Sequence, residues 1–420
     1  MTTIAYIANA FPSPLEPYVS DEITELRRRG AQVICCSGKR VSPNDLSLEE
    51  RAFWKETRFF QPLSDDDLVG AVRRLASDRR HLWQLLRPLL WERGASPTRC
   101  IRTLGHTVMG AALAEQLEPL KVEHIHAHHG YFASWMALAA ARLLGIGFSF
   151  TLHGSDLLQR ADLLPAKLRA CLFCVTVSDF NRQYILRNYP SMPSEKIIVQ
   201  RLGVDRVLPW PTPAPAAAAG QRRFCLLSVG RLHRVKDYRF LIRACAALRD
   251  QGLDFLCWIV GEGPERPALE NQIMALGLQG RVYLIGHVPR TGLPGYYRYA
   301  DLVVMTSKSE GIPVVLMEAM AHENLVLAPA ITGIPELVEH QRTGFLYQPG
   351  SLPDFVSAVS WIQGHKASLA GIQRAAAASI AASYNRQRNL RTFAEQFLAR
   401  IPQSDGDHAH PILQQVRLSV

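Results

Sequence analysis

The sequence of 420 residues lacks long apolar runs, although 48% of its residues are hydrophobic. No run reaches the roughly 18 unbroken apolar residues of a membrane-spanning helix. The first residues, MTTIAYIANAFPSP, also lack the positively charged start of a secretory signal peptide. We therefore expect a globular protein that is cytoplasmic, with the inner face of the cytoplasmic membrane as a second possible location.

Residue groups at metal-ligand spacing are scarce. Cys171 and Cys174 form a C-x-x-C motif inside the apolar run CLFCVTVS, and no second pair completes a zinc site. D-x-D motifs begin at Asp65 and Asp405, but neither follows a hydrophobic strand. The first is typical of an acidic helix start, and the second lies in the C-terminal tail. We therefore expect no catalytic metal.

The three-glycine fingerprint of dinucleotide-binding proteins is missing too, because no third glycine completes the pair Gly261 and Gly263. Short apolar runs instead alternate with longer helical patterns, which is typical of parallel βαβ units. Six candidate strands precede a Pro- and Ala-rich segment, and six follow it. The pattern predicts an α/β protein with two Rossmann-like doubly wound parallel-sheet domains facing across a cleft. The expected domains are 1–205, a linker 206–222, and 223–385, followed by a terminal helix 386–401 and a tail 402–420.

The most informative stretch runs from Asp301 to Leu337. It predicts a strand, a polar loop with Glu310, a helix opened by Pro313, and a second carboxylate, Glu318, inside that apolar helix. A carboxylate in such a helix needs a partner, which a hydroxyl-rich ligand would supply. The free N–H groups at the helix start suit a phosphate. The alternative is a surface glutamate and a salt-bridged helix glutamate.

Two cations follow the first strand of the second half, in VGRLHRVKDY. Arg231 and Lys236 lie in the turn between that strand and the next helix, where open α/β sheets bind ligands. They could neutralise a diphosphate, whose negative charge grows as a sugar–phosphate bond breaks. The alternative is a pair of solvated surface cations.

The spacing E-x7-E in SEGIPVVLMEAMA and the pattern GRL…K resemble the group 1 retaining glycosyltransferases, family four of the GT-B enzymes. The resemblance implies that Glu310 contacts the donor sugar and Glu318 the ribose, while Arg231 and Lys236 neutralise the donor diphosphate. It also implies that the terminal helix crosses back to the first domain. Further contacts follow from the same resemblance: backbone groups at Gly311, Ile312 and Val314, and base-side turns at Gly263, His287 and Val288.

In the first half, H-G-x-D after a predicted strand matches the family's acceptor-side domain and implies roles for His153 and Asp156. The alternative for Asp156 is to cap the next helix. The first loop resembles an F-P-x-x-x-E variant found in transferases of extracellular polysaccharide assembly, the colanic-acid type among them. Glu16 and Tyr18 thereby become candidate acceptor or donor contacts.

A histidine-rich strand end, HIHAHHG, carries His126, His128 and His129. We expect alternation along the strand to point these side chains apart. Because no cysteine or carboxylate stands at metal-ligand spacing, we expect no metal there.

The segment from Leu68 to Gly110 is strongly basic. It holds eight arginines against two acidic residues, a net charge of +6, together with Trp and Leu at helical spacing. This pattern suits an anionic membrane surface, contacted through Arg73, Arg74, Arg79 and Arg80. The alternative is an ordinary amphipathic helix with a solvated face; no nucleic-acid-binding module accompanies the charge.

Together these patterns predict an enzyme that moves a hexose from a nucleotide-diphosphate sugar to a saccharide acceptor, implied to be lipid-linked, in cell-surface or exopolysaccharide biosynthesis. The nucleotide sugar is a substrate, so no cofactor is expected. Two alternatives remain at this point: a nucleotide-sugar epimerase or hydrolase, and a non-catalytic nucleotide-sugar-binding partner of an active transferase.

Overall fold

The structure is a computed structural model that describes residues 1–14, 16–44, 46–91, 97–158, 163–205 and 223–402. The predicted linker 206–222, the tail from residue 403 and the D-x-D motif at Asp405 lie outside the described residues. The chain divides into two compact units. The first contains Met1–Val175, Tyr189–Ile198 and the described residues from Leu390 onward, and the second contains Thr176–Asn188 and Val199–Asn389.

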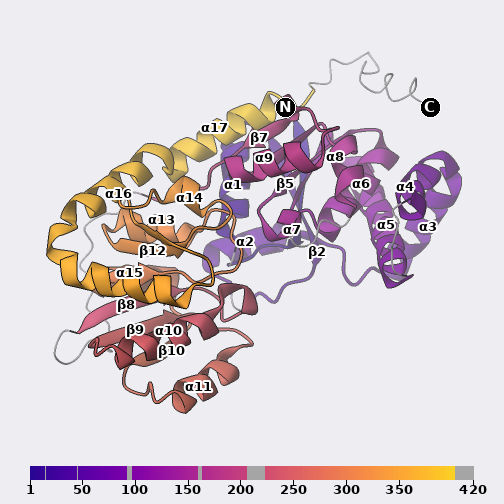
Figure 1. The fold of residues 1–420 in the computed structure, drawn as a ribbon. Coiled ribbons are helices and arrows are strands. Elements are labelled where there is room, and N and C mark those ends of the chain that lie inside the picture. The colour runs from indigo at the N-terminus through magenta and orange to yellow at the C-terminus, as the bar shows by residue number, and fades with distance from the viewer. Residues whose placement is uncertain (15, 45, 92–96, 159–162, 206–222, 403–420) are drawn as a thin grey trace. The chain divides into compact units, whose positions relative to one another are not determined.

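The first unit is built on a seven-stranded parallel sheet with the order β3-β2-β1-β4-β5-β6-β7 (Figure 1). All six predicted strands are present; the seventh, β3, has two residues and is too short to give a sequence pattern. Its strands are β1 (Thr3–Ala10), β2 (Gln32–Lys39), β3 (Arg58–Phe59), β4 (His124–His128), β5 (Gly147–Leu152), β6 (Phe173–Thr176) and β7 (Ile197–Val199). The helices of this part of the chain are α1 (Pro17–Arg28), α2 (Leu48–Glu56), α3 (Asp65–Ser77), α4 (Arg79–Trp91), α5 (Pro97–Leu117), α6 (Phe132–Leu144), α7 (Ser155–Leu158), α8 (Leu164–Ala170) and α9 (Asp179–Asn188).

The second unit has a six-stranded parallel sheet with the order β10-β9-β8-β11-β12-β13, and each strand corresponds to a predicted one. Its strands are β8 (Phe224–Val229), β9 (Phe255–Val260), β10 (Val282–Gly286), β11 (Leu302–Val304), β12 (Leu325–Pro329) and β13 (Phe345–Tyr347). The helices from β8 to the end of the described chain are α10 (Tyr238–Asp250), α11 (Arg266–Ala275), α12 (Leu293–Tyr299), α13 (Val314–Ala321), α14 (Ile334–Leu337), α15 (Leu352–His365), α16 (Ala370–Ser383) and α17 (Arg386–Leu398).

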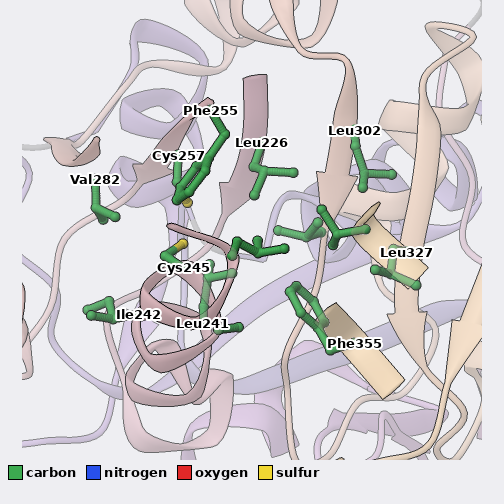
Figure 2. Close-up of a cluster of buried hydrophobic side chains, with 14 of the residues drawn as sticks. Leu226, Leu241, Ile242, Cys245, Phe255, Cys257, Val282, Leu302, Leu327 and Phe355 are labelled. Carbon is green, nitrogen blue, oxygen red and sulfur yellow. The ribbon is translucent and has the colours of Figure 1, made fainter. Parts of the chain in front are cut away.

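Both faces of the second sheet are buried under helices, which explains why its strands are continuously apolar. Figure 2 shows one face, where Leu241 and Cys245 of α10 point at Leu226 and Cys257 of the sheet. Full burial of one such leucine stabilises the fold by about 1.5–3 kcal/mol. Asp237 is the N-cap of helix α10, and its side chain accepts a hydrogen bond from the Phe240 amide.

The last helix, α17, contributes its C-terminal part to the first unit. Phe393 and Phe397 are fully buried in the same cluster as Tyr6 and Phe173 of the first sheet. In the second unit, the Glu336 carboxylate accepts hydrogen bonds from the first amides of α9, at Asp179 and Phe180. This cap attaches α9 to the second unit.

The strand order changes direction between β1 and β4 in the first sheet, and between β8 and β11 in the second. At such switch points, the loops that follow the two central strands diverge and leave a crevice at the carboxyl edge of the sheet. Glu16 follows β1, Arg231 and Lys236 follow β8, and Glu310 follows β11, so these predicted residues lie in such loops.

Candidate functional site

In the second unit, the loops after β8 and β11 are joined by backbone contacts. The Lys308 amide donates to the Val235 carbonyl oxygen at 2.8 Å, and the Thr306 hydroxyl donates to the Lys236 carbonyl oxygen at 2.9 Å. These bonds fix the turn that carries Lys236 against the loop that carries Glu310.

As a result, the Lys236 Nζ donates to Glu310 Oε1 at 2.7 Å. Both side chains are partly buried, with 23% and 13% exposed. Two residues that the sequence places 74 positions apart therefore form one ion pair at the carboxyl edge of the sheet. Removal from bulk water makes their electrostatic interaction stronger than that of an exposed pair.

The start of α13 follows Glu310 directly. Pro313 is its N-terminal flanking residue, and no side chain of the described residues caps its first amides at Val314 and beyond. The loop after β12 supports this turn: the Thr332 hydroxyl donates to the Glu310 carbonyl oxygen at 2.6 Å. A Cβ on Gly333 would lie only 2.5 Å from the Gly311 carbonyl oxygen, so this contact requires glycine. The N–H groups near Gly311 thus open on the same loop as Glu310.

Glu318 lies on the second turn of α13 and has found partners within the protein. It accepts a hydrogen bond from the Tyr297 hydroxyl at 2.9 Å, and Arg290 Nε lies 3.7 Å away. Burial raises the pKa of Glu318, while Tyr297 and Arg290 act in the opposite direction. Sequence reasoning did not find these partners, because they come from the neighbouring helix α12 and the turn before it.

The other predicted residues of the second unit lie in neighbouring turns. Arg231 follows β8, is exposed, and makes no side-chain hydrogen bond or ion pair with the described part of the chain. Gly263 packs against the loop that carries Arg231: a Cβ on Gly263 would lie 2.4 Å from the Leu232 carbonyl oxygen. His287 and Val288 follow β10, His287 exposed and Val288 packed against the core. Ile312 is buried in that same core cluster.

In the first unit, the loops after β1, β4 and β5 bring a second set of predicted residues together. His129 Nε2 lies 2.9 Å from Glu16 Oε1, and its Nδ1 lies 3.6 Å from Asp156. Burial disfavours a charged imidazole, yet the carboxylates of Asp156 and Glu16 outweigh it and raise the pKa of His129 to about 10. Asp156 lies in α7 and also accepts from the amides of Gly130, His153 and Gly154, which precede that helix, so these bonds are not a cap of its first turn. Burial opposes ionisation of Asp156, but His129, His153 and the Gly154 amide lower its pKa.

His153 joins this cluster through His128. Its Nε2 lies 3.1 Å from His128 Nδ1, and its ring lies 4.8 Å from that of Tyr18. His128 Nε2 lies 2.9 Å from the carboxylate of Glu22. Burial lowers the pKa of His153, with further lowering by His129 and His128, so it is neutral at pH 7.

The hydrogen bonds are compatible with one arrangement of tautomers. A neutral His128 that donates from Nε2 to the Glu22 carboxylate accepts at Nδ1 from His153 Nε2–H. The Nδ1 of a neutral His153 is therefore an acceptor, suited to a hydroxyl group.

The expectation that the histidines point apart and lack a carboxylate is wrong. His126 and His128 are two positions apart on β4, so their side chains lie on the same face of the sheet. His129, just after the strand, adopts a left-handed backbone conformation with φ 68°. Glu22 and Glu16, more than a hundred positions earlier, supply the carboxylates. The histidines recur with a period of two in HIHAH, and this spacing could have predicted that their side chains share one face of the strand.

Glu22, His126 and His128 could hold a metal ion, because one ligand atom from each lies within 4.8 Å of the others. All three are buried and already hydrogen-bonded: His126 contacts Ser149 and Thr151, and Glu22 bridges Tyr6 and His128. The D-x-D motif at Asp65 is the start of α3, where Asp67 and Ser64 form a capping box. The absence of a catalytic metal stays a prediction.

The basic segment forms α3, α4 and the start of α5, which lie together in Figure 1. Arg73, Arg79 and Arg80 are exposed, but Arg74 pairs with Glu118 at 2.8 Å and Glu115 at 3.3 Å. Among the described residues, every helix is too short or too polar to span a lipid bilayer.

Two family models match this chain. Residues 215–376 match "Glycosyl transferases group 1", and residues 15–207 match "Glycosyltransferase Family 4". The amylovoran biosynthesis glycosyltransferase of Erwinia amylovora is 25% identical over 93% of this chain and 98% of its own. The putative colanic acid biosynthesis glycosyltransferase of Escherichia coli is 28% identical over 82% of this chain and 86% of its own.

Solved structures show the same two-sheet GT-B fold. A sucrose-phosphate synthase from Thermosynechococcus elongatus superimposes with a TM-score of 0.73 at 18% identity, covering 95% of this chain and 99% of that one. An Anabaena protein solved in complex with UDP gives 0.68 at 19% identity, covering 95% and 100%. The predicted fold class, an α/β protein with two parallel-sheet domains of the GT-B type, is therefore confirmed.

Proposed function

Because the chain belongs to the group 1 glycosyltransferases, we propose that it transfers a hexose from a nucleotide-diphosphate sugar to a saccharide acceptor in exopolysaccharide synthesis, with retention at the transferred carbon. The observation that carries this proposal is the Lys236–Glu310 ion pair at the uncapped start of α13. The names of the relatives from Erwinia and Escherichia support the exopolysaccharide role.

The donor is held in the second unit. Arg231 and Lys236 neutralise the diphosphate, and the amides from Gly311 to Val314 add the positive end of the helix dipole. Glu310 accepts from hydroxyls of the sugar. Glu318 accepts from the ribose hydroxyls, beside the base turns at Gly263, His287 and Val288. The Anabaena structure with bound UDP supports a nucleotide at this fold.

In the transfer step, the bond between the sugar C1 and the diphosphate oxygen breaks as the acceptor oxygen bonds to C1 from the same face. The acceptor hydroxyl proton passes to the leaving diphosphate. The two cations and the α13 amides stabilise the charge that develops there, so no metal ion is required. This chemistry needs the positive groups to be placed in advance, as the backbone contacts around Lys236 place them.

The acceptor contacts the first-unit cluster. His153 presents Nδ1 to an acceptor hydroxyl, Tyr18 flanks its ring, and Asp156 and Glu16 fix His129 beside it. A lipid-linked saccharide is the acceptor implied by the resemblance. The enzyme then works at the cytoplasmic face of the membrane, with Arg73, Arg79 and Arg80 facing anionic headgroups.

A thermal-shift panel of UDP, GDP, ADP and their sugars tests the donor assignment. A ligand at about 100 times its dissociation constant stabilises a protein by about 2.7 kcal/mol. We expect one nucleotide series to raise the melting temperature, and Glu310→Ala and Lys236→Ala to abolish sugar transfer without unfolding the protein. Full transfer by either variant, or sugar release that needs no acceptor, would overturn the proposal.

A further inference from the structure

A cavity of about 420 Å³ lies in the first unit, and none of the site residues assigned above is part of its described lining. It is formed where β1 and β2 end, between the start of α5 and the start of α6. Its described lining carries four basic side chains and no carboxylate: Lys39, Arg99, Arg102 and Lys167.

The rings of Phe132 and His106 line the cavity together with the basic side chains. Lys39 Nζ lies 5.8 Å from the centre of the Phe132 ring, and His106 stacks on that ring at 5.0 Å. Lys167 is buried, and its Nζ donates to the carbonyl oxygens of Gly130 at 2.6 Å and Tyr131 at 3.0 Å.

The basic side chains also change the electrostatic environment of His106, which lines the same cavity. Burial, with Arg102 and Lys167, lowers the pKa of His106 to about 4. His106 is therefore neutral at pH 7 and can accept or donate a hydrogen bond there. The positive charge around the cavity therefore comes from lysine and arginine side chains.

Four cations around one cavity fit an anion that carries more than one negative charge. Arginine is suited to phosphate, whose oxygens accept two parallel hydrogen bonds from one guanidinium. The volume lies within the ordinary range for small-molecule sites.

We propose that this cavity binds the phosphate or diphosphate group of the sugar acceptor, with Lys39 and Arg102 as its outer contacts and Arg99 and Lys167 as its inner ones. The proposal rests on the proposed transferase function and adds the acceptor's anionic group to it.

The test is calorimetric titration of the full chain with inorganic pyrophosphate and with farnesyl diphosphate. The nucleoside diphosphate selected by the thermal-shift panel is kept at saturation, so that the donor site is filled. The pocket variant is Lys39→Gln/Arg102→Gln; both residues are exposed, so the fold should tolerate the change. The control variant, Arg40→Gln/Arg374→Gln, removes the same charge. Arg40 instead packs over Trp54 and Phe59, and Arg374 is an exposed residue of α16.

We expect the pocket variant to weaken binding of both probes by about tenfold or more, because two charge-assisted contacts are lost. The control variant should stay within about twofold of the wild type. Tighter binding of farnesyl diphosphate than of pyrophosphate assigns the group to a lipid carrier, and equal binding assigns it to a phosphate without a lipid. Equal affinities of wild type and pocket variant would overturn the proposal. Nucleotide binding by the pocket variant is unaffected in either case, so failure here is distinct from failure of the transferase assignment.

Discussion

The two glutamates of the second unit differ in what neutralises them. Glu310 has the ammonium group of Lys236 at 2.7 Å, whereas Glu318 has a neutral hydroxyl and a more distant guanidinium. Burial therefore raises the pKa of Glu318. A carboxylate with such a shifted pKa at the edge of a parallel sheet is a candidate ligand contact, which is the role proposed for Glu318.

The first prediction concerns Glu318→Gln. Because the folded-state pKa of Glu318 is raised, its ionisation destabilises the fold as pH rises through that value. The amide should raise the melting temperature of the ligand-free protein at pH 7, with a smaller gain at low pH. It should also weaken nucleotide binding by about tenfold, because a charged acceptor is lost. Melting curves at pH 4 and pH 7, with and without nucleotide, check both parts; a variant that melts lower at pH 7 and binds normally would contradict them.

The second prediction concerns pH and His129. Its folded-state pKa of about 10 lies above that of an unfolded histidine. The resulting stability is fully present below pH 6.5 and is lost as pH rises toward 10, at up to about 1.4 kcal/mol per pH unit. His129→Gln should remove this slope. Urea unfolding between pH 6 and pH 10 measures it, and identical slopes in both proteins would show that the ion pair is not formed.

At the scale of single residues, the sequence predicted where the candidate site residues stand, but it did not predict which side chains contact them. The spacing of Glu310 and Glu318 was visible in one segment, and so was the H-G-x-D of His153 and Asp156. Tyr297 was not found, because a buried tyrosine on another helix carries no pattern of its own. Glu22 was missed for a similar reason: on α1 it reads as an ordinary helix glutamate.

Among the structural elements, the turn before α13 depends on its neighbour after β12. Ala at Gly333 would place a Cβ 2.5 Å from the Gly311 carbonyl oxygen, which is too close for any side chain. We predict that Gly333→Ala destabilises the fold by about 1–3 kcal/mol through overpacking and lowers sugar transfer by moving Glu310.

The matched control is Gly364→Ala. This glycine lies in α15, where an added Cβ meets nothing within 4 Å, so the helix should gain up to about 1 kcal/mol. Denaturant unfolding and transfer rates measure both changes. Equal effects of the two substitutions would refute the close-packing argument.

The helices α3 and α4 give a second element-level prediction. Charge reversal of the exposed Arg73, Arg79 and Arg80 should reduce binding to anionic lipid vesicles by about 1 kcal/mol per residue. Reversal of Arg74 should instead lower stability, because it would face Glu115 and Glu118. Unchanged sedimentation of the triple variant with the vesicles would show that this surface does not meet membranes.

Elements were the most predictable level. Twelve of the strands follow from short apolar runs between helical patterns, since strands buried on both faces cannot alternate with polar residues. β3 was missed because two residues contain no period. The uncapped start of α13 was also visible, because proline before an apolar helix marks such a terminus.

For the whole molecule, two sheets of similar order each carry a cluster at their switch point. In the second unit the cluster is cationic and acidic at a helix start, which suits a nucleotide sugar. In the first unit it is histidine-rich beside a cationic cavity, which suits a saccharide with a charged carrier. Net charge and composition alone indicated neither, because +10 spread over 420 residues does not locate a site.

The central claim is that Lys236 and Glu310 hold the donor, and its most direct test is calorimetric titration of four proteins: wild type, Lys236→Ala, Glu310→Ala and the control Lys308→Ala. Lys308 is a neighbouring, exposed lysine that pairs with Asp237. We predict that Lys236→Ala weakens binding of the free nucleoside diphosphate by about tenfold or more. Glu310→Ala should weaken binding of the nucleotide sugar only, and Lys308→Ala should change the affinity for neither ligand. Wild-type affinities in the Lys236 and Glu310 variants would contradict the account.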